Sequence, residues 1–124
     1  MNSSPYKRPG WPSVIPRIFV ADVEGLVTFI KTVLDAEGTY EPERPTELQI
    51  DDSLLLVSDG GGVRDPAPAA LYVYVPDTDA TFQRAIEAGA ISVEAPSNQF
   101  YGDRRATVTD RWGNFWQFAT CPKD

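Results

Sequence analysis

The sequence contains no histidine, and this absence removes more chemistry than any other feature of its composition. Without an imidazole there is no Ser-His or Cys-His pair for nucleophilic catalysis, and the most common metal-ligating side chain in proteins is missing. Only one cysteine is present, Cys121, so no internal disulfide bond can form. We therefore expect no catalytic residues of this kind, and a reducing, cytoplasmic location.

Positive charge is also scarce, with 11 lysines and arginines against 18 acidic residues and a net charge of −7. Such a field repels phosphates and anionic lipids, so nucleic acid and membranes are not expected partners. It attracts a cationic small molecule, although the same acidity also serves simply to keep a protein in solution. No apolar run approaches the roughly 20 residues that span a bilayer. No glycine-rich phosphate loop follows a strand, and we expect no cofactor.

The length of 124 residues is that of one domain, which we assign to residues 1–124. The first 13 residues are interrupted by prolines and lack the apolar stretch of a signal peptide, so we interpret them as an N-terminal arm. Glycine and proline crowd residues 59–69, which we interpret as an internal linker. The linker separates a first module, residues 14–58, from a second module, residues 70–120.

The two modules repeat one pattern of elements. In the first, "VIPRIFV" alternates like a strand, Asp22 follows as a helix N-cap, and a helical apolar stripe begins at Val23. "TELQI" and "SLLLVS" then indicate two strands joined at Asp51–Asp52. In the second, Asp77 caps a helix ending near Gly89. The predicted strands of the second module are residues 70–75, 91–95, 104–110 and 114–120.

We interpret each module as a β-α-β-β-β unit. The predicted fold class is α+β, with tandem βαβββ modules forming an eight-stranded curved sheet and helices on the outside. One helix covers only one face of each half-sheet, so the other face forms an open cup. A concave surface of this kind is the expected ligand site.

Two segments of the second module, "LYVYVPDTDATFQRAIEAGA" and "YGDRRATVTDRWGNFWQFAT", carry a family resemblance. With the tandem repeat they resemble the vicinal oxygen chelate superfamily, which contains glyoxalase I, extradiol dioxygenases, fosfomycin-modifying enzymes and bleomycin-binding resistance proteins. The last hairpin is similar to the glyoxalase-related branch, which reads G-D-R and then D-P-x-G-x-x-W, with Arg111 here in place of the proline. The resemblance covers about Val14 to Thr120 and implies the fold and a homodimer.

In metal-dependent members of this family, four side chains lining the cup hold a divalent ion. The resemblance places Ile15, Leu56, Ala70 and Gln117 at these positions. Of the four, only Gln117 carries a donor atom, a neutral carbonyl oxygen, whereas such ions prefer carboxylates or imidazoles. We therefore expect no metal ion, and the resemblance implies the fold without its usual chemistry.

Strand alternation from these positions predicts the side chains that line the cup. Ile15 brings Arg17 and Phe19 to the same face, Ala70 brings Tyr72 and Tyr74, and Gln117 brings Phe115. Pairing Asn114 with Thr109 across the last turn adds Val108, Ala106 and Arg104. The candidate ligand-binding residues are Arg17, Phe19, Tyr72, Tyr74, Arg104, Phe115 and Gln117.

Each candidate also has a structural interpretation. Phe19, Phe115 and Tyr72 are residues that strands favour in any core. Arg17 is of a type that commonly pairs with a carboxylate, and Gln117 cannot transfer protons.

Two further groups near the last hairpin have structural interpretations as well. Asp103 and Arg105 form an expected ion pair at a strand edge. Trp112, in the last turn, is expected to cover a neighbouring surface, either of its own chain or of a second subunit.

Three functions remain open at this point. The first is a metal-independent protein that binds an aromatic or cationic small molecule, in the manner of bleomycin resistance proteins. The second is a glyoxalase-like isomerase or lyase with a non-standard or absent metal site. The third is a fold relic that acts as an interaction module.

Overall fold

The computed structural model describes residues 5–122 and contains nine regular elements. The first module holds one helix and three strands: β1 (Arg17–Phe19), α1 (Val23–Leu34), β2 (Thr46–Ile50) and β3 (Ser53–Ser58). The second module holds one helix and four strands: β4 (Ala70–Tyr74), α2 (Thr78–Glu87), β5 (Ile91–Asn98), β6 (Arg104–Thr109) and β7 (Phe115–Thr120). The order of elements is as predicted in the second module, the first module has one strand fewer than predicted, and β2 and β3 have the predicted bounds.

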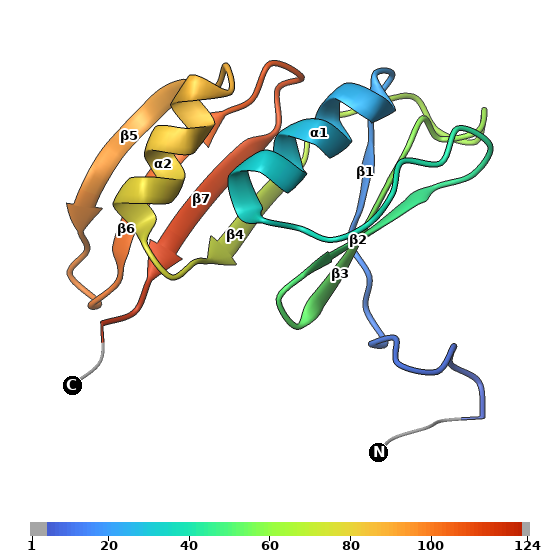
Figure 1. Ribbon diagram of the computed structural model, residues 1–124, viewed down its shortest axis with the longest axis horizontal. Coiled ribbons are helices and arrows are strands. Elements are labelled where there is room, and N and C mark those ends of the chain that lie inside the picture. The colour runs from blue at the N-terminus through green and yellow to red at the C-terminus, as the bar shows by residue number, and fades with distance from the viewer. Residues whose placement is uncertain (1–4, 123–124) are drawn as a thin grey trace.

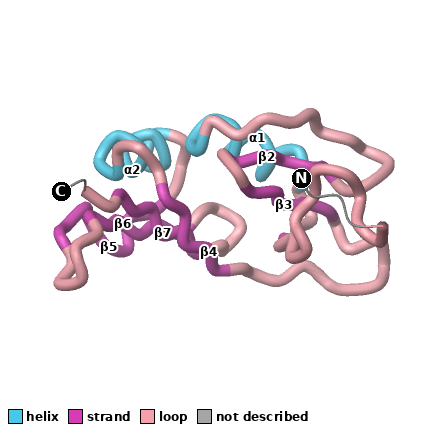
Figure 2. Tube along the Cα trace, turned by 90° about the horizontal axis from the view of Figure 1, so that it is seen from below, coloured by secondary structure: helices cyan, strands magenta, loops and turns pink. Residues whose placement is uncertain are grey.

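The strands form two mixed sheets that lie beside each other (Figure 1), with strand orders β1-β3-β2 and β4-β7-β6-β5. Figure 2 shows both helices on the same side of the strands. The faces turned toward the helices bury a common core that includes Ile18, Leu26, Ile30, Leu48, Val57, Val108, Trp116 and Phe118. The opposite faces carry no helix, and the α+β fold with an uncovered face is therefore as expected.

Both helices begin at the aspartates that the sequence indicates. The Asp22 side chain accepts a hydrogen bond from the backbone N–H of Gly25 at 3.0 Å, and Asp77 accepts one from Ala80 at 3.1 Å. Each bond satisfies an amide that the first helical turn leaves unpaired. Arg84 is on α2, and its guanidinium donates to the carbonyl oxygen of Val33 near the end of α1. The two modules are thus tied at their helices as well as through the core.

The predicted eighth strand does not form, and the sheets hold three and four strands. The segment between α1 and β2 touches β2 through one bridge, in which Glu37 and Gln49 exchange backbone hydrogen bonds of 2.9 and 2.8 Å. Beyond the bridge, the N–H of Glu41 bonds to the side chain of Thr46 instead of a strand. The prolines at 42 and 45 have no N–H to donate, so the ladder cannot continue.

The predicted first strand, residues 14–20, shortens to Arg17–Phe19. In its parallel pairing with β3, the carbonyl oxygen of Pro16 accepts from the N–H of Leu56 at 3.0 Å. The next bond of the regular ladder would require an N–H from Pro16, which proline lacks. The chain before Pro16 therefore leaves the sheet, and the adjacent edge of β3 has no strand partner.

A buried aspartate organises the turn between β6 and β7. Asp110 is 3% exposed and accepts hydrogen bonds from the backbone of Trp112 and Asn114 and from the indole N–H of Trp116 at 2.8 Å. Trp112 packs on Phe29 of α1, with ring centroids 6.1 Å apart. The neighbouring surface that Trp112 covers therefore belongs to its own chain.

Within the residues that the structure describes, no helix is both long and apolar enough to cross a membrane.

Candidate functional site

The uncovered face of the second sheet carries most of the candidate residues. In β7, Trp116 and Phe118 are fully buried beneath the helices, so the alternating residues Phe115 and Gln117 point to the opposite face. β4 runs parallel to β7 and places Tyr72 beside Gln117 on that face. Two residues further along β4, Tyr74 takes the same side. These four side chains therefore share one surface, as the alternation predicts.

The aromatic side chains on this face are not ordinary core residues. Tyr72 is 41% exposed, Tyr74 is 61% exposed and Phe115 is 37% exposed. The rings of Tyr72 and Tyr74 pack edge to face, with centroids 5.7 Å apart. The surface therefore presents aromatic rings to solvent beside polar groups, and the interpretation of Tyr72 and Phe115 as buried core is wrong.

A buried carboxylate lies next to the two tyrosines. Asp103 is 4% exposed, and its Oδ2 accepts hydrogen bonds from the hydroxyl of Tyr72 at 2.7 Å and from that of Tyr74 at 2.9 Å. The expected ion pair between Asp103 and Arg105 does not form. Among the described residues, Asp103 takes part in no salt bridge.

The acidic partner shifts the titration of both phenols. Burial, together with hydrogen bonds to Tyr101 and Asp103, raises the pKa of Tyr72 far above its ordinary value. The hydrogen bond to Asp103 raises the pKa of Tyr74 in the same direction. Ionising either phenol would place a second negative charge against the Asp103 carboxylate. Both hydroxyls therefore remain protonated and donate to Asp103.

A second polar cluster lies on β5 and β6 of the same sheet. The guanidinium of Arg105 makes a two-bond ion pair with Glu94, at 2.9 and 2.8 Å. Thr107 donates to Glu94 at 2.8 Å, and the amide of Gln117 donates to the Thr107 hydroxyl at 3.4 Å. The hydrogen bonds from Arg105 and Thr107 lower the pKa of Glu94. Glu94 is thus held as a carboxylate at neutral pH.

Tyr101 joins the two clusters into one network. Its hydroxyl lies 3.0 Å from that of Tyr72 and accepts a hydrogen bond from Arg105 at 3.1 Å. We refer to the connected set as the tyrosine network. It consists of Tyr72, Tyr74, Glu94, Tyr101, Asp103, Arg105, Thr107 and Gln117.

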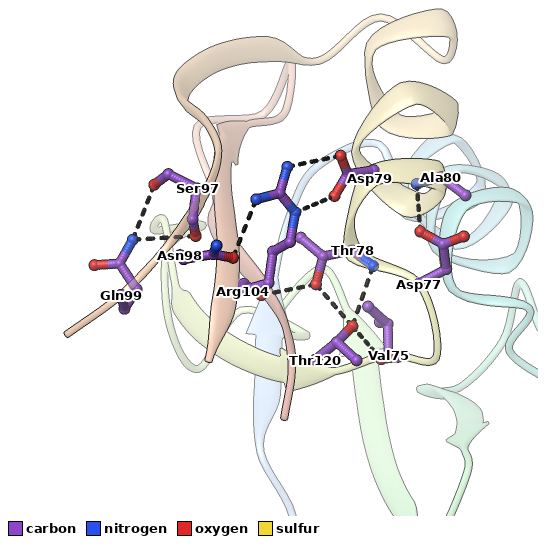
Figure 3. A network of polar contacts seen from close by, with 10 residues as sticks. All are labelled: Val75, Asp77, Thr78, Asp79, Ala80, Ser97, Asn98, Gln99, Arg104 and Thr120. Carbon is purple, nitrogen blue, oxygen red and sulfur yellow. Dashed lines mark hydrogen bonds and ion pairs between the residues drawn. The ribbon is translucent and has the colours of Figure 1, made fainter. Parts of the chain in front are cut away.

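Arg104 does not line this face, and the register expected for the last hairpin is wrong. Thr109 pairs with Phe115 rather than Asn114, which brings Arg105 and Thr107 to the open face and turns Arg104 toward α2. There Arg104 makes a two-bond ion pair with Asp79 at 2.6 and 2.9 Å and a bond to Asn98, as Figure 3 shows. This pair lowers the pKa of Asp79.

Figure 3 also shows two hydrogen bonds to backbone carbonyl oxygens near Arg104. Thr78, at the start of α2, donates to the carbonyl oxygen of Arg104 at 2.8 Å, and Thr120 donates to that of Val75 at 2.7 Å. The side of the sheet that holds Arg104 is therefore occupied by structural contacts to α2.

Arg17 and Phe19 lie on the first sheet and are held by contacts of their own. Arg17 donates to the Ser58 hydroxyl at 3.2 Å, and its guanidinium lies 5.2 Å from the ring centroid of Phe19. Arg64, from the linker, lies at the same distance from that ring. Within the described residues Arg17 forms no ion pair, contrary to its structural interpretation.

The family's metal positions do not suit a divalent ion. Leu56 lies opposite Arg17 in the first sheet, and Ala70 lies opposite Phe115 in the second. With Ile15, they offer hydrocarbon only, and the Gln117 amide is engaged with Thr107. One neutral oxygen cannot replace the charged ligand set that such ions require. Elsewhere in residues 5–122, no group of three or more acidic or cysteine side chains could hold a metal ion.

The sequence interpretation missed five members of the network: Glu94, Tyr101, Asp103, Arg105 and Thr107. Arg105 and Thr107 lie on the face of β6 opposite to that of Arg104. Shifting the predicted pairing of β6 with β7 by one residue would have placed them on the open face. Glu94 lies between two register shifts in the pairing of β5 with β6, which simple alternation does not follow.

The fold combines a βαββ module with a βαβββ module and has both helices on one side of the strands. The family model described as Glyoxalase/Bleomycin resistance protein/Dioxygenase superfamily matches residues 13–118. The chain therefore belongs to this superfamily. An uncharacterised protein of Mycobacterium tuberculosis strain H37Rv is 30% identical over 122 residues, covering 85% of this chain and 72% of that protein.

Solved structures share the fold at lower identity. TioX from Micromonospora sp. ML1 superposes with a TM-score of 0.75 at 20% identity, covering 90% of this chain and 99% of TioX. TnmS3, an antibiotic binding protein from Streptomyces sp. CB03234, gives a TM-score of 0.71 at 21% identity, covering 87% of this chain and 93% of TnmS3.

Proposed function

We propose that this chain is a metal-independent small-molecule-binding protein that holds a planar, N–H-bearing or cationic ligand on the open face of its second sheet. The observation that carries the proposal is the tyrosine network, in which exposed aromatic rings surround hydroxyl groups that donate their protons within the network. Rings of this kind suit a flat ligand, and fixed polar groups orient it.

The direction of the hydrogen bonds favours a ligand that donates. Tyr72 and Tyr74 each give their only proton to Asp103, so Tyr101 must donate to Tyr72. Thr107 gives its proton to Glu94, so the neighbouring Gln117 nitrogen must be the donor and its oxygen is left free. The hydroxyls and the amide thus offer oxygen lone pairs to a bound molecule.

Charge supports the same class of ligand. Asp103 lacks a basic partner among the described residues, while Glu94 and Arg105 neutralise each other. The whole chain carries a net charge of −7. A cationic ligand is therefore attracted both by the local carboxylate and by the overall field. The antibiotic-binding description of TnmS3, a structural neighbour, is consistent with this function.

We further propose that the chain works as a cytoplasmic homodimer. Tyr72 and Tyr74 border the two cavities between the sheets, whereas Phe115 and Gln117 line neither, so the open face around Phe115 and Gln117 is a sheet surface that a second copy would enclose. Several apolar side chains near this face are exposed, among them Ile91 and the 99% exposed Phe100. Sedimentation velocity at micromolar concentration tests the dimer, and a monomer there would contradict it.

A thermal-shift comparison of matched flat probes tests the ligand class. Proflavine carries aromatic amines and a positive charge, whereas acridine-9-carboxylate has a similar ring system and a negative charge. We expect proflavine to raise the melting temperature and the carboxylate to have little effect. Screening cationic glycopeptide and heteroaromatic antibiotics then extends the series. Equal stabilisation by both probes, or by none of the compounds, would overturn the proposal.

Two variants locate the binding site. Gln117→Leu removes the free oxygen and Tyr74→Phe removes one hydroxyl, so each should weaken proflavine binding by about fivefold, the value of roughly one hydrogen bond. Arg104→Gln serves as the control because Arg104 contacts α2 instead. A weakening by the control as large as that by Gln117→Leu would contradict the assigned face.

Elemental analysis separates this proposal from a metal-dependent isomerase or lyase. We expect no stoichiometric zinc, nickel, manganese or iron in the purified protein, and no change in melting temperature when these ions are added. Stoichiometric metal would require ligands other than Ile15, Leu56 and Ala70, and would favour the enzyme.

A further inference from the structure

Two adjoining cavities follow the seam between the two sheets. The smaller, of about 370 Å³, lies between the first half of β3 and β4, and the larger, of about 970 Å³, lies between the ends of α1, β4 and β7. They share Ile50, Asp51 and Tyr74 in their linings. We refer to the two together as the seam groove. Their volumes are those of ligand sites in general, roughly 300–1,000 Å³.

One wall of the seam groove, formed by residues 71–75, belongs to an unpaired strand edge, which continues beyond the lining to Ala70. On β4, Ala69 accepts from Phe115 and Val75 donates to Ala119, so the odd-numbered residues face β7. The backbone N–H and C=O groups of Ala70, Tyr72 and Tyr74 therefore point away from β7. None of these six groups has a hydrogen-bond partner among the described residues.

The opposite wall is the edge of β3 that faces β1, and it is unpaired beside Pro16 because proline has no N–H to donate. Leu56 donates to Pro16 and Ser58 accepts from Val20, so the even-numbered residues of β3 face β1. Leu54 is the next even residue, and the chain before Pro16 has already left the sheet. Its backbone groups have no ladder partner, and Pro16 itself lines the smaller cavity. Two free strand edges thus border one groove.

The rim of the groove is acidic. Four carboxylates belong to its lining, Asp35, Glu37, Asp51 and Asp52, and among residues 5–122 the lining contains no lysine or arginine. None of the four takes part in an ion pair within residues 5–122. The remaining lining is largely apolar, with Leu34, Ile50, Leu54, Leu71, Val73, Val75 and Pro76. The groove therefore combines hydrocarbon, free backbone groups and uncompensated negative charge.

We propose that the seam groove binds an extended peptide of a partner protein, which adds a strand to the free edge of β4 and carries alternating apolar and basic side chains. The main chain pairs with Ala70, Tyr72 and Tyr74, the apolar side chains enter the cavities, and lysine or arginine lies beside the aspartates. Strand addition of this kind draws affinity from the backbone and specificity from alternate side chains.

Charge and composition select this occupant over parts of the protein itself. The proposed dimer uses the open face, and a second copy placed at the groove instead would bring a chain of net charge −7 against four carboxylates. The chain's own arm has prolines at 5, 9 and 12, each of which interrupts strand pairing. A basic peptide meets neither obstacle.

Fluorescence polarisation with synthetic peptides tests the proposal. The probe is a blocked, labelled octapeptide of alternating valine and lysine. One control replaces lysine with glutamate, and another carries N-methyl groups on every second residue, which removes donors along one edge. We expect the lysine peptide to bind at least tenfold more tightly than either control. Equal binding of all three peptides, or no binding of the lysine peptide, would refute strand addition at an acidic groove.

Matched variants assign the binding to the groove. Ala70→Pro removes one edge N–H, while Ala70→Val keeps it, so only the proline variant should lose at least tenfold in affinity. The charge pair Asp51→Asn with Asp52→Asn leaves the backbone donors intact and should weaken binding and its salt dependence. Glu24→Gln with Glu43→Gln makes the same charge change away from the groove and should have no effect. Binding that survives both Ala70→Pro and the aspartate pair would overturn the proposal.

Two further readouts separate the outcomes. Amide resonances of Ala70, Tyr72 and Tyr74 should shift on adding the lysine peptide, and unchanged resonances would place the peptide elsewhere. If Ala70→Pro instead converts a dimer into a monomer while the peptide does not bind, the occupant is a second copy and the peptide proposal is wrong. Gln117 lines neither cavity, so Gln117→Leu should leave peptide binding unchanged even though Tyr72 and Tyr74 belong to both proposed sites.

Discussion

The hydroxyl of Tyr74 lies 2.9 Å from Oδ2 of Asp103, the same oxygen that receives the hydroxyl of Tyr72 at 2.7 Å. A single oxygen of a buried carboxylate thus organises both phenols of the open face. Burial and its hydrogen bonds raise the pKa of Tyr72, and the hydrogen bond to Asp103 raises the pKa of Tyr74. Asp103 therefore determines which hydrogen-bonding groups the surface offers.

The first prediction concerns the alkaline titration of Tyr74. Its raised pKa means that the folded state holds the phenol proton more tightly than the unfolded state does. The resulting stability is present below the ordinary value near 10 and is lost as the pH rises through the raised value. The absorbance change at 295 nm that Tyr74→Phe removes from the wild-type titration should therefore occur above pH 10.

Asp103→Asn provides the comparison for this prediction. The amide has no negative charge, so the phenols should ionise at lower pH than in the wild-type protein. An unchanged titration curve in this variant would show that Asp103 does not control the two tyrosines.

The second prediction concerns acid stability. Arg105 and Thr107 lower the pKa of Glu94 from its ordinary value of 4.5. Their contribution to folding is present above pH 4.5 and is lost as the pH falls through the lowered value. Glu94→Gln should cost about 1 kcal/mol of unfolding free energy at pH 7, the size expected for a partly exposed ion pair, and much less near pH 3. Urea unfolding at the two pH values measures this difference, and an equal loss at both would contradict it.

The third prediction concerns the turn between β6 and β7. Asp110→Ala leaves the buried indole N–H of Trp116 and the backbone amides of the turn without acceptors. We expect a loss of about 3 kcal/mol in unfolding free energy, because each orphaned buried donor costs about 1–3 kcal/mol. Asp110→Asn retains one side-chain oxygen and should lose less. Chemical denaturation of both variants provides the measurement, and equal losses would argue against the acceptor role.

Local signals in the sequence predicted much of the fold. Helix caps at Asp22 and Asp77 and the two-residue turn at Asp51–Asp52 act over a few residues, and their effects appear in the structure as expected. The last hairpin was misread because its register depends on how Asp110 folds the turn. That fold uses side-chain acceptor bonds to the backbone of Trp112 and Asn114, which strand alternation does not report.

For the site as well, local patterns were predictable and pairing between strands was not. Alternation within β4 relates Tyr72 to Tyr74, and alternation within β7 relates Phe115 to Gln117. The family resemblance, which assigns Ala70 and Gln117 to the cup, related the two strands to each other. Arg105 and Glu94 meet only through the pairing of β5 with β6, and that pairing contains two register shifts. The sequence therefore predicted which residues of one strand share a face, but it did not predict the contacts between β5 and β6.

The last prediction concerns the segment that replaces the eighth strand. Gly38 has a φ of 146°, and a Cβ atom there would lie 2.3 Å from the carbonyl oxygen of Glu47 in β2. Gly62 also has a positive φ, of 83°, but a Cβ atom there would meet nothing within 4 Å. Alanine at either position incurs the backbone strain, about 1 kcal/mol, and only Gly38→Ala adds a collision with the neighbouring strand.

We therefore expect Gly38→Ala to lower the unfolding free energy by about 3 kcal/mol and Gly62→Ala by about 1 kcal/mol. Urea unfolding measures both changes. The collision lies beside the bridge between Glu37 and Gln49, so the amide of Gln49 should also exchange faster with solvent in Gly38→Ala. Similar losses in the two variants, with unchanged exchange at Gln49, would mean that the segment packs more loosely on β2 than this close approach requires.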